Sequence, residues 1–100
     1  MTRILAVDDS PSMRDMVRIA LTGAGFEVTQ AADGQQALDL ARKSAFDLVL
    51  SDVNMPVMDG IALIRALRAE ASYRHTPILM LTTEASMDRK KEGKEAGATG

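Results

Sequence analysis

Residues 4–10 read ILAVDDS, four apolar residues in a row followed by two aspartates and a serine. A continuous apolar run of this length is typical of a β-strand that is buried on both faces. Ser10 and Pro11 then give the signal for a helix start, a capping hydroxyl ahead of a proline in the first turn. Apolar residues recur at three- and four-residue spacing as far as Gly23, which predicts an amphipathic helix. The stretch therefore predicts a buried strand, an acidic turn and a helix.

This pattern of apolar run, turn and helix occurs four times along the chain. Predicted strands cover residues 4–7, 26–29, 48–50 and 78–81, and predicted helices begin near residues 10, 33, 59 and 86. Strands that alternate with helices favour a parallel sheet, because each parallel neighbour needs a crossover connection. Right-handed crossovers place helices on both faces of that sheet. We therefore expect an α/β fold with a doubly wound parallel sheet.

The composition narrows the class of protein. One hundred residues, of which 46% are hydrophobic and 26% charged, make one small globular domain. A net charge of −2 and only three aromatic residues argue against nucleic acid as the ligand. The absence of cysteine excludes disulfides, thiol catalysis and thiolate metal sites, and the apolar runs are too short to cross a membrane. We expect a cytoplasmic protein with no nucleic-acid partner and no membrane insertion.

Polar side chains follow three of the predicted strands. Asp8 and Asp9 follow the first strand, Asp52 the third, and Thr82 and Thr83 the fourth. Ligands of such sheets bind outside the carboxyl ends of the strands, so these side chains are expected in one crevice. Carboxylates this close repel one another unless a cation is present, and oxygen ligands favour Mg²⁺. One aspartate after a strand is more often a helix cap, but three at strand ends favour a functional cluster that a phosphoryl group would complete.

Four stretches of the chain carry a family resemblance. They are ILAVDDS at 4–10, DLVLSDVNMPVMDG at 47–60, PILMLTTE at 77–84 and AGATG at 96–100. In these stretches the chain resembles the receiver domain of two-component response regulators, of the single-domain chemotaxis CheY type. The resemblance implies a flavodoxin-like doubly wound sheet with strand order 2-1-3-4. Residues 1–100 are then expected to form a single, incomplete receiver domain that lacks the usual fifth strand and fifth helix.

The resemblance also implies a role for each residue of the site. Asp52 matches the phosphoacceptor, which takes a phosphoryl group from the phosphohistidine of a histidine kinase. Asp9 and Asp52 match direct Mg²⁺ ligands, while Asn54 contributes its backbone carbonyl and Asp8 acts through water. Thr82 matches the switch hydroxyl that turns inward to hold the phosphoryl oxygen. On this reading the chain is a phosphoprotein of a two-component phosphorelay and is not an enzyme.

Partners follow from the same resemblance, and one alternative stays open. The expected partners are a histidine kinase and a downstream target such as a flagellar switch component. Without a fifth strand, residues 78–81 would form an exposed apolar edge, so we also expect self-association or element swapping between chains. The alternative is an aspartate-nucleophile phosphohydrolase, because Asp52-Val53-Asn54 after a buried strand resembles the start of the haloacid dehalogenase class. Turnover of a phosphomonoester would favour that alternative.

Overall fold

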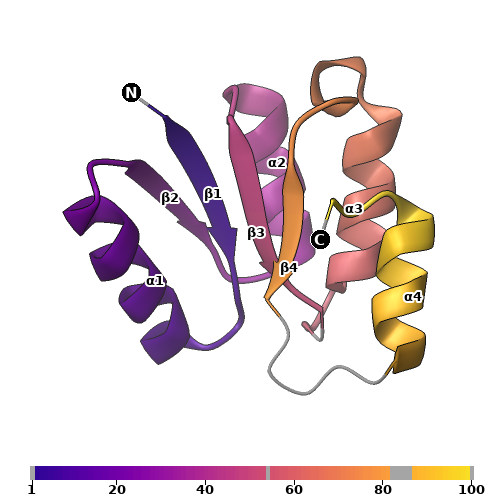
Figure 1. The fold of residues 1–100 in the computed structure, drawn as a ribbon, viewed down its shortest axis with the longest axis horizontal. Coiled ribbons are helices and arrows are strands. Elements are labelled where there is room, and N and C mark those ends of the chain that lie inside the picture. Colours follow the sequence, from indigo (N-terminus) through magenta and orange to yellow (C-terminus); the bar gives the residue numbers. More distant parts are fainter. Residues whose placement is uncertain (1, 54, 82–86, 100) are drawn as a thin grey trace.

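The fold is a parallel sheet flanked by helices. The computed structural model describes residues 2–53, 55–81 and 87–99. Its elements are, in order, β1 (Arg3–Val7), α1 (Pro11–Gly23), β2 (Glu27–Ala31), α2 (Gly34–Lys43), β3 (Leu48–Asp52), α3 (Gly60–Ala69), the 3-10 helix η1 (Ala71–Tyr73), β4 (Ile78–Leu81) and α4 (Met87–Ala96). All neighbouring strands pair in parallel, in the order β2-β1-β3-β4 (Figure 1). The predicted α/β class and the strand order 2-1-3-4 are confirmed.

The main core lies between the sheet and helices α2 and α3. Leu5 of β1 and Val49 of β3 are fully buried there and belong to one cluster with Ile64 of α3. Because side chains alternate along a strand, Ile4 and Ala6 point to the other face of the sheet. Helix α1 stands on that face, in contact with β1 and β2 (Figure 1). β1 therefore has both faces covered, which explains its uninterrupted apolar sequence.

Helix α1 covers its face of the sheet only in part. None of its residues is buried, and the side chains of Met16 and Ile19 are 64% and 62% exposed. Leu79 and Leu81 of β4 are half-buried on the same face, and β4 forms an edge of the described sheet. We call these four residues the open face. The expected apolar edge strand is therefore present among the described residues, whereas self-association stays a prediction.

Local capping explains where the first three helices begin. The side chains of Ser10, Asp33 and Asp59 each accept a hydrogen bond from the backbone N–H three residues further along. Such bonds satisfy N–H groups that have no partner inside the helix.

None of the described helices is long and apolar enough to cross a membrane.

Strand β2 does not follow its predicted bounds of residues 26–29. The Phe26 N–H donates to the Leu21 carbonyl at 3.1 Å, so this residue still belongs to the end of α1. At the other end, Ala31 pairs with Val7, so the strand continues beyond its predicted end at residue 29. Pairing with β1 thus sets the bounds of β2, and tertiary context overrides the local propensity.

The 3-10 helix η1 between α3 and β4 is not indicated by the sequence. Its last residue, Tyr73, is only 3% exposed. The hydroxyl oxygen lies 2.8 Å from the Ala41 carbonyl oxygen and 2.7 Å from the Ser44 carbonyl oxygen, which share its one proton. Burial of the ring raises the pKa of Tyr73. The tyrosine therefore fastens the connection before β4 to the end of α2.

Candidate functional site

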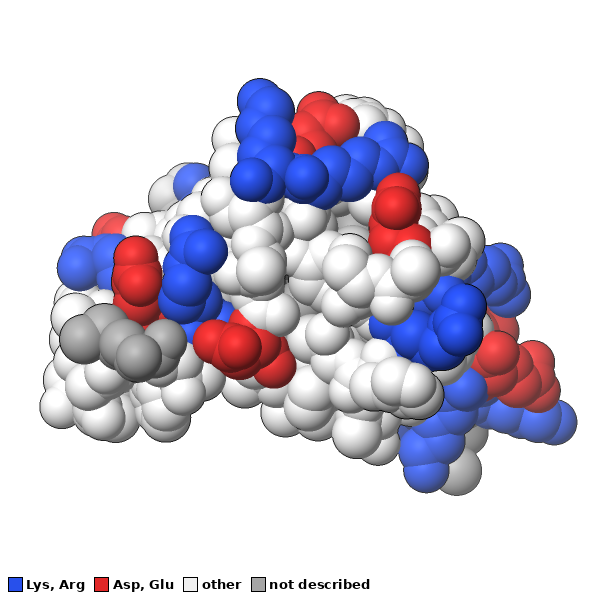
Figure 2. All heavy atoms as spheres, turned by 90° about the horizontal axis from the view of Figure 1, so that it is seen from above, with Lys and Arg blue, Asp and Glu red and all other residues white. Residues whose placement is uncertain are grey.

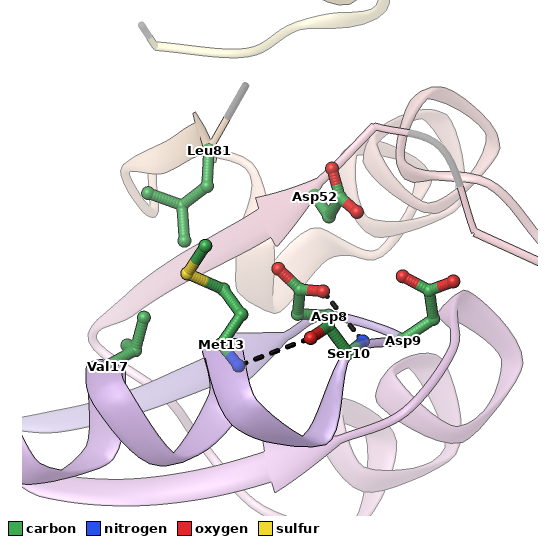
Figure 3. Close-up of a pocket in the computed structure, with 7 residues that line it drawn as sticks. All are labelled: Asp8, Asp9, Ser10, Met13, Val17, Asp52 and Leu81. Carbon is green, nitrogen blue, oxygen red and sulfur yellow. Dashed lines mark hydrogen bonds between the residues drawn. The ribbon is translucent and has the colours of Figure 1, made fainter. Parts of the chain in front are cut away.

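A pocket of about 390 Å³ opens at the carboxyl ends of β1 and β3, beside the start of α1. Its lining residues are Asp8, Asp9, Ser10, Met13, Val17, Asp52 and Leu81 (Figure 3). The aspartates supply a polar side, and Met13, Val17 and Leu81 supply an apolar wall. The pocket lies where the rule for parallel α/β sheets places ligands.

The turn after β1 fixes one of the carboxylates. Oδ1 of Asp8 accepts a hydrogen bond from the Ser10 N–H at 2.9 Å, and Ser10 Oγ accepts one from the Met13 N–H at 3.3 Å. Arg14 Nη1 donates to the Asp8 carbonyl oxygen at 2.6 Å. Ser10, which caps helix α1, therefore also orients Asp8, which is 8% exposed, while Asp9 beside it is exposed.

Asp52 is the last residue of β3, and its neighbours hold it in place. Leu81 pairs with it across the sheet, and the Val53 N–H donates to its Oδ1 at 2.8 Å. The Ser51 hydroxyl donates to the Asp52 carbonyl oxygen at 2.8 Å. Gly60, the first residue of α3, lies so close that a Cβ atom there would overlap this carbonyl oxygen. A glycine is therefore required at the start of α3.

The three carboxylates are placed to share a cation. One carboxylate oxygen from each of Asp8, Asp9 and Asp52 lies within 4.8 Å of the other two. A donor set of oxygens alone suits a hard divalent cation such as Mg²⁺. Within the part of the chain that the structure describes, no other group of three or more Asp, Glu, His or Cys side chains lies this close together. The cluster can therefore hold a metal ion.

Some of the predicted site lies outside the described residues, and some of the site was not predicted. Asn54 and the Thr82-Thr83 pair are not among the residues that the structure describes, so their roles stay predictions. The apolar wall from α1 was not anticipated. The four-residue spacing of Met13 and Val17 places both on one side of that helix and could have indicated it.

The opposite end of the sheet, where the strands begin, carries a different charge pattern. Figure 2 looks onto this end and shows Asp and Glu interspersed among Lys and Arg. Ion pairs join some of them: Arg42 Nε lies 2.8 Å from Glu70 Oε1, and Arg3 Nε lies 3.7 Å from Glu27 Oε2. The acidic groups at the pocket are instead gathered into one cluster, which distinguishes the pocket as the candidate site.

Comparisons with known proteins agree with this geometry. Residues 4–100 match the family model of the response regulator receiver domain. The chemotaxis protein CheY-3 of Vibrio cholerae is 43% identical over 99 residues, which cover 98% of this chain and 76% of that protein. The structure of chemotaxis protein CheY4 of Vibrio cholerae matches with a TM-score of 0.96 and 56% identity, covering 100% of this chain and 83% of that one. The receiver domain of the sensor histidine kinase PA1611 from Pseudomonas aeruginosa, solved with a magnesium ion coordinated in its active site cleft, matches with a TM-score of 0.91 and 34% identity, covering 98% and 80%.

The matches correct one expectation drawn from the sequence. The statement that the chain is not an enzyme is wrong as a flat exclusion. The chain matches the receiver family and CheY-3, and membership of that family describes a fold and a pocket without excluding catalysis by the residues of that pocket.

The comparisons favour one of the two function classes that the sequence left open. The carboxylates at the ends of β1 and β3 fit either class, because both need an aspartate that attacks a phosphoryl group. The family match and the similarity to CheY proteins do not favour a haloacid dehalogenase. Given the strand order, the carboxylate cluster and the matched residues 4–100, the chain belongs to the response regulator receiver family, and it is of the CheY type.

Proposed function

We propose that Asp52 accepts a phosphoryl group from the phosphohistidine of a histidine kinase, and that the phosphorylated chain signals to a partner. The observation that supports this proposal is that Asp8, Asp9 and Asp52 come within 4.8 Å of one another at the carboxyl ends of the strands. In the transfer, a carboxylate oxygen of Asp52 attacks phosphorus and the P–N bond breaks. The electron pair of that bond stays on the imidazole nitrogen of the kinase. The protein contributes mainly by positioning the carboxylate for an in-line transfer.

The carboxylate cluster would hold Mg²⁺, with Asp9 and Asp52 as direct ligands and Asp8 acting through water. Asn54 would add its backbone carbonyl, and Thr82 would be the switch hydroxyl that holds a phosphoryl oxygen. When bound, Mg²⁺ neutralises charge on the transferring group. The all-oxygen donor set supports this assignment, as does the magnesium ion in the cleft of the PA1611 receiver domain.

The names of the relatives support a place in chemotaxis. CheY-3 and CheY4 of Vibrio cholerae are both chemotaxis proteins. By this similarity the output target would be a component such as the flagellar switch, and the chain would act in the cytoplasm. Residues 1–100 would belong to a single receiver domain.

The open face supports a further partner, a second copy of this chain. Strand β4, with the sequence ILML, has no charged residue or proline that would discourage pairing at its edge. Thr99 already occupies the edge at Ile78: the Thr99 N–H donates to the Ile78 carbonyl at 2.7 Å, and Thr99 Oγ1 accepts from the Ile78 N–H at 3.1 Å. Pairing between two β4 edges would therefore begin at Met80. A two-fold arrangement of this kind would bring the half-buried Leu79 of the two copies close together on the open face.

Labelling with a small phosphodonor tests the proposed function. The chain is incubated with acetyl phosphate and Mg²⁺, and its intact mass is recorded. We expect the wild type to gain one phosphoryl group that is stable in acid and labile in base, as an acyl phosphate is. Asp52→Asn should gain none, because an amide is a poor nucleophile. Asp39→Asn, at an exposed position of α2, makes the same change of charge outside the pocket and serves as the control.

Two results would count against the proposal. Full labelling of Asp52→Asn would show that another residue is the acceptor. Continuous turnover of a phosphomonoester such as p-nitrophenyl phosphate, lost in Asp52→Asn and kept in Asp39→Asn, would restore the phosphohydrolase alternative.

A further inference from the structure

The loop that joins β3 to α3 contains a strained backbone turn. The Met58 N–H donates to the Pro56 carbonyl at 2.8 Å, and Val57 between them has a φ of 69°. This i to i+2 bond with a positive φ is the rare, strained form of the γ-turn. A β-branched residue is among the least suited to positive φ, and Val57 is 82% exposed, so its side chain gains little from packing. Surrounding contacts must therefore hold the turn in place.

The contact that holds it comes from the start of α2. The Gly34 N–H donates to the Met58 carbonyl at 3.1 Å. A Cβ atom at Gly34 would overlap that carbonyl oxygen and would come within 2.8 Å of Cγ and 2.9 Å of Cβ of Met58. The obstacle is partly backbone, which a change of rotamer does not remove. The site accepts only glycine because Met58 lies directly against it.

The same loop is tied to Asp52 at its other end. The Val53 N–H donates to Asp52 Oδ1 at 2.8 Å, and the Val53 carbonyl accepts from the Gly60 N–H at 2.8 Å. A displacement of Met58 can therefore reach Val53, the residue that follows the phosphoacceptor, through Asp59 and the hydrogen bond from the Gly60 N–H to the Val53 carbonyl. Misplacing a reacting group by about 1 Å can lower a rate by about 100-fold.

We infer that Gly34 is a positioning residue for Asp52. It admits Met58 at the start of α2, and by holding the strained turn at Val57 it sets the geometry of the loop between Asp52 and α3. The inference rests on the proposed function, since it concerns the phosphoryl transfer to Asp52. Gly34 touches no group of the pocket itself and acts only through Met58.

The test compares three Gly→Ala variants for the rate of labelling by acetyl phosphate at saturating Mg²⁺. We expect Gly34→Ala to lower the maximal rate by about 10- to 100-fold, with little change in the acetyl phosphate concentration that gives half of it. Gly23→Ala is the neutral control, because nothing lies within 4 Å of a Cβ there. Gly93→Ala is the control for a strained but remote site, because its Cβ would overlap only the Met80 side chain.

A second variant separates positioning from a general loss of stability. Adding Val57→Gly to Gly34→Ala makes the positive φ easy, so that the loop can shift at Met58 without moving Asp52. We expect this pair to recover at least part of the lost rate and to keep the test usable if Gly34→Ala alone does not fold. An unchanged rate in folded Gly34→Ala, or a loss no larger than in Gly93→Ala at equal stability, would overturn the inference.

Hydrogen exchange in the wild type decides the matter independently of labelling. If Gly34 holds Met58, its amide should be protected to the same degree as the Gly60 amide, because both bonds close the same loop. An unprotected Gly34 amide would refute the inference even where labelling succeeds. Failure of the wild type to be labelled, with Gly34 protected, would instead count against the proposed function alone.

Discussion

Asp9→Asn isolates the electrostatic repulsion inside the carboxylate cluster. Among the described residues Asp9 has no side-chain hydrogen bond, whereas Asp8 accepts one from Ser10 and Asp52 accepts one from Val53. Replacing Asp9 therefore changes its charge and leaves the capping turn intact. Without metal, the variant should be more stable than the wild type, because two repulsive pairs are removed.

The distances give the size of this effect. Each pair of carboxylate oxygens is at most 4.8 Å apart. Two unit charges at that distance repel by about 1 kcal/mol in water and by about 3.5 kcal/mol at an effective dielectric constant of 20. Because Asp9 is exposed, the lower figure applies to each of its pairs, and salt reduces it further. We expect a gain of about 1–2 kcal/mol in the free energy of unfolding, which raises Tm by about 5–10 °C in a domain of this size.

Thermal unfolding by circular dichroism checks this in EDTA and in excess Mg²⁺, at low micromolar protein so that self-association does not contribute. Mg²⁺ should raise the Tm of the wild type by mass action and that of Asp9→Asn much less. The difference in Tm between the two proteins should therefore become smaller or change sign. Asp39→Asn is the control for net charge and should follow the wild type in both buffers. A lower Tm for Asp9→Asn than for the wild type in EDTA would refute the reasoning, because it would mean that Asp9 stabilises the metal-free fold.

Three other perturbations have expected outcomes. Tyr73→Phe leaves two carbonyl oxygens at the end of α2 without their donor and should lower the free energy of unfolding by about 1–3 kcal/mol in urea titrations. Burial raises the pKa of Tyr73 above its ordinary value of 10.0, so its contribution to the free energy of unfolding is complete below pH 10.0 and is lost as the pH rises through the raised pKa. The loss of stability at alkaline pH should therefore be smaller in Tyr73→Phe than in the wild type. An equal loss in both proteins would contradict the assignment. Leu79→Lys, which puts a charge on the edge strand β4, should weaken the concentration-dependent self-association that we expect for the wild type in sedimentation velocity, whereas Ala62→Lys on the exposed side of α3 should not. A wild type that stays monomeric at high micromolar concentration would contradict the open-face proposal. Arg68→Met should unfold at a lower urea concentration, because Arg68 Nη1 donates to the Tyr73 carbonyl at 2.6 Å and to the Thr76 carbonyl at 2.7 Å, just before β4. An unchanged urea midpoint of unfolding would show that water replaces the guanidinium.

Much of the fold was predictable because its signals are local. The run at residues 4–7 is apolar throughout, since β1 lies between two other strands and is covered on both faces. Asp33 and Asp59 mark the starts of α2 and α3, because a carboxylate satisfies helix N–H groups without help from distant residues. The positions of Asp8, Asp9 and Asp52 follow from those strands, because the carboxyl ends of neighbouring parallel strands meet at one edge.

The features that sequence alone did not reveal depend on distant partners. The bounds of β2 follow from its pairing with β1, and η1 is stabilised by the hydrogen bonds of Tyr73 to residues 29 and 32 positions earlier in the chain. No short-range pattern contains that information. The apolar wall of the pocket likewise requires Leu81 and Met13, which come together only when β4 and α1 are in place.

The turn at Val57 is the clearest case, because there the local preference argues against the observed structure. Valine disfavours positive φ, and a sequence reading of Met55-Pro56-Val57-Met58 gives no reason to expect it. The conformation persists because Gly34, 24 positions before Met58, offers the carbonyl a donor and leaves room that no other residue would leave. Local and global preferences agree through most of a natural fold, and they conflict where another demand is placed on the chain. Here the conflict lies in the loop that begins directly after Asp52, which is why we place its cause in the positioning of the phosphoacceptor and not in the stability of the sheet.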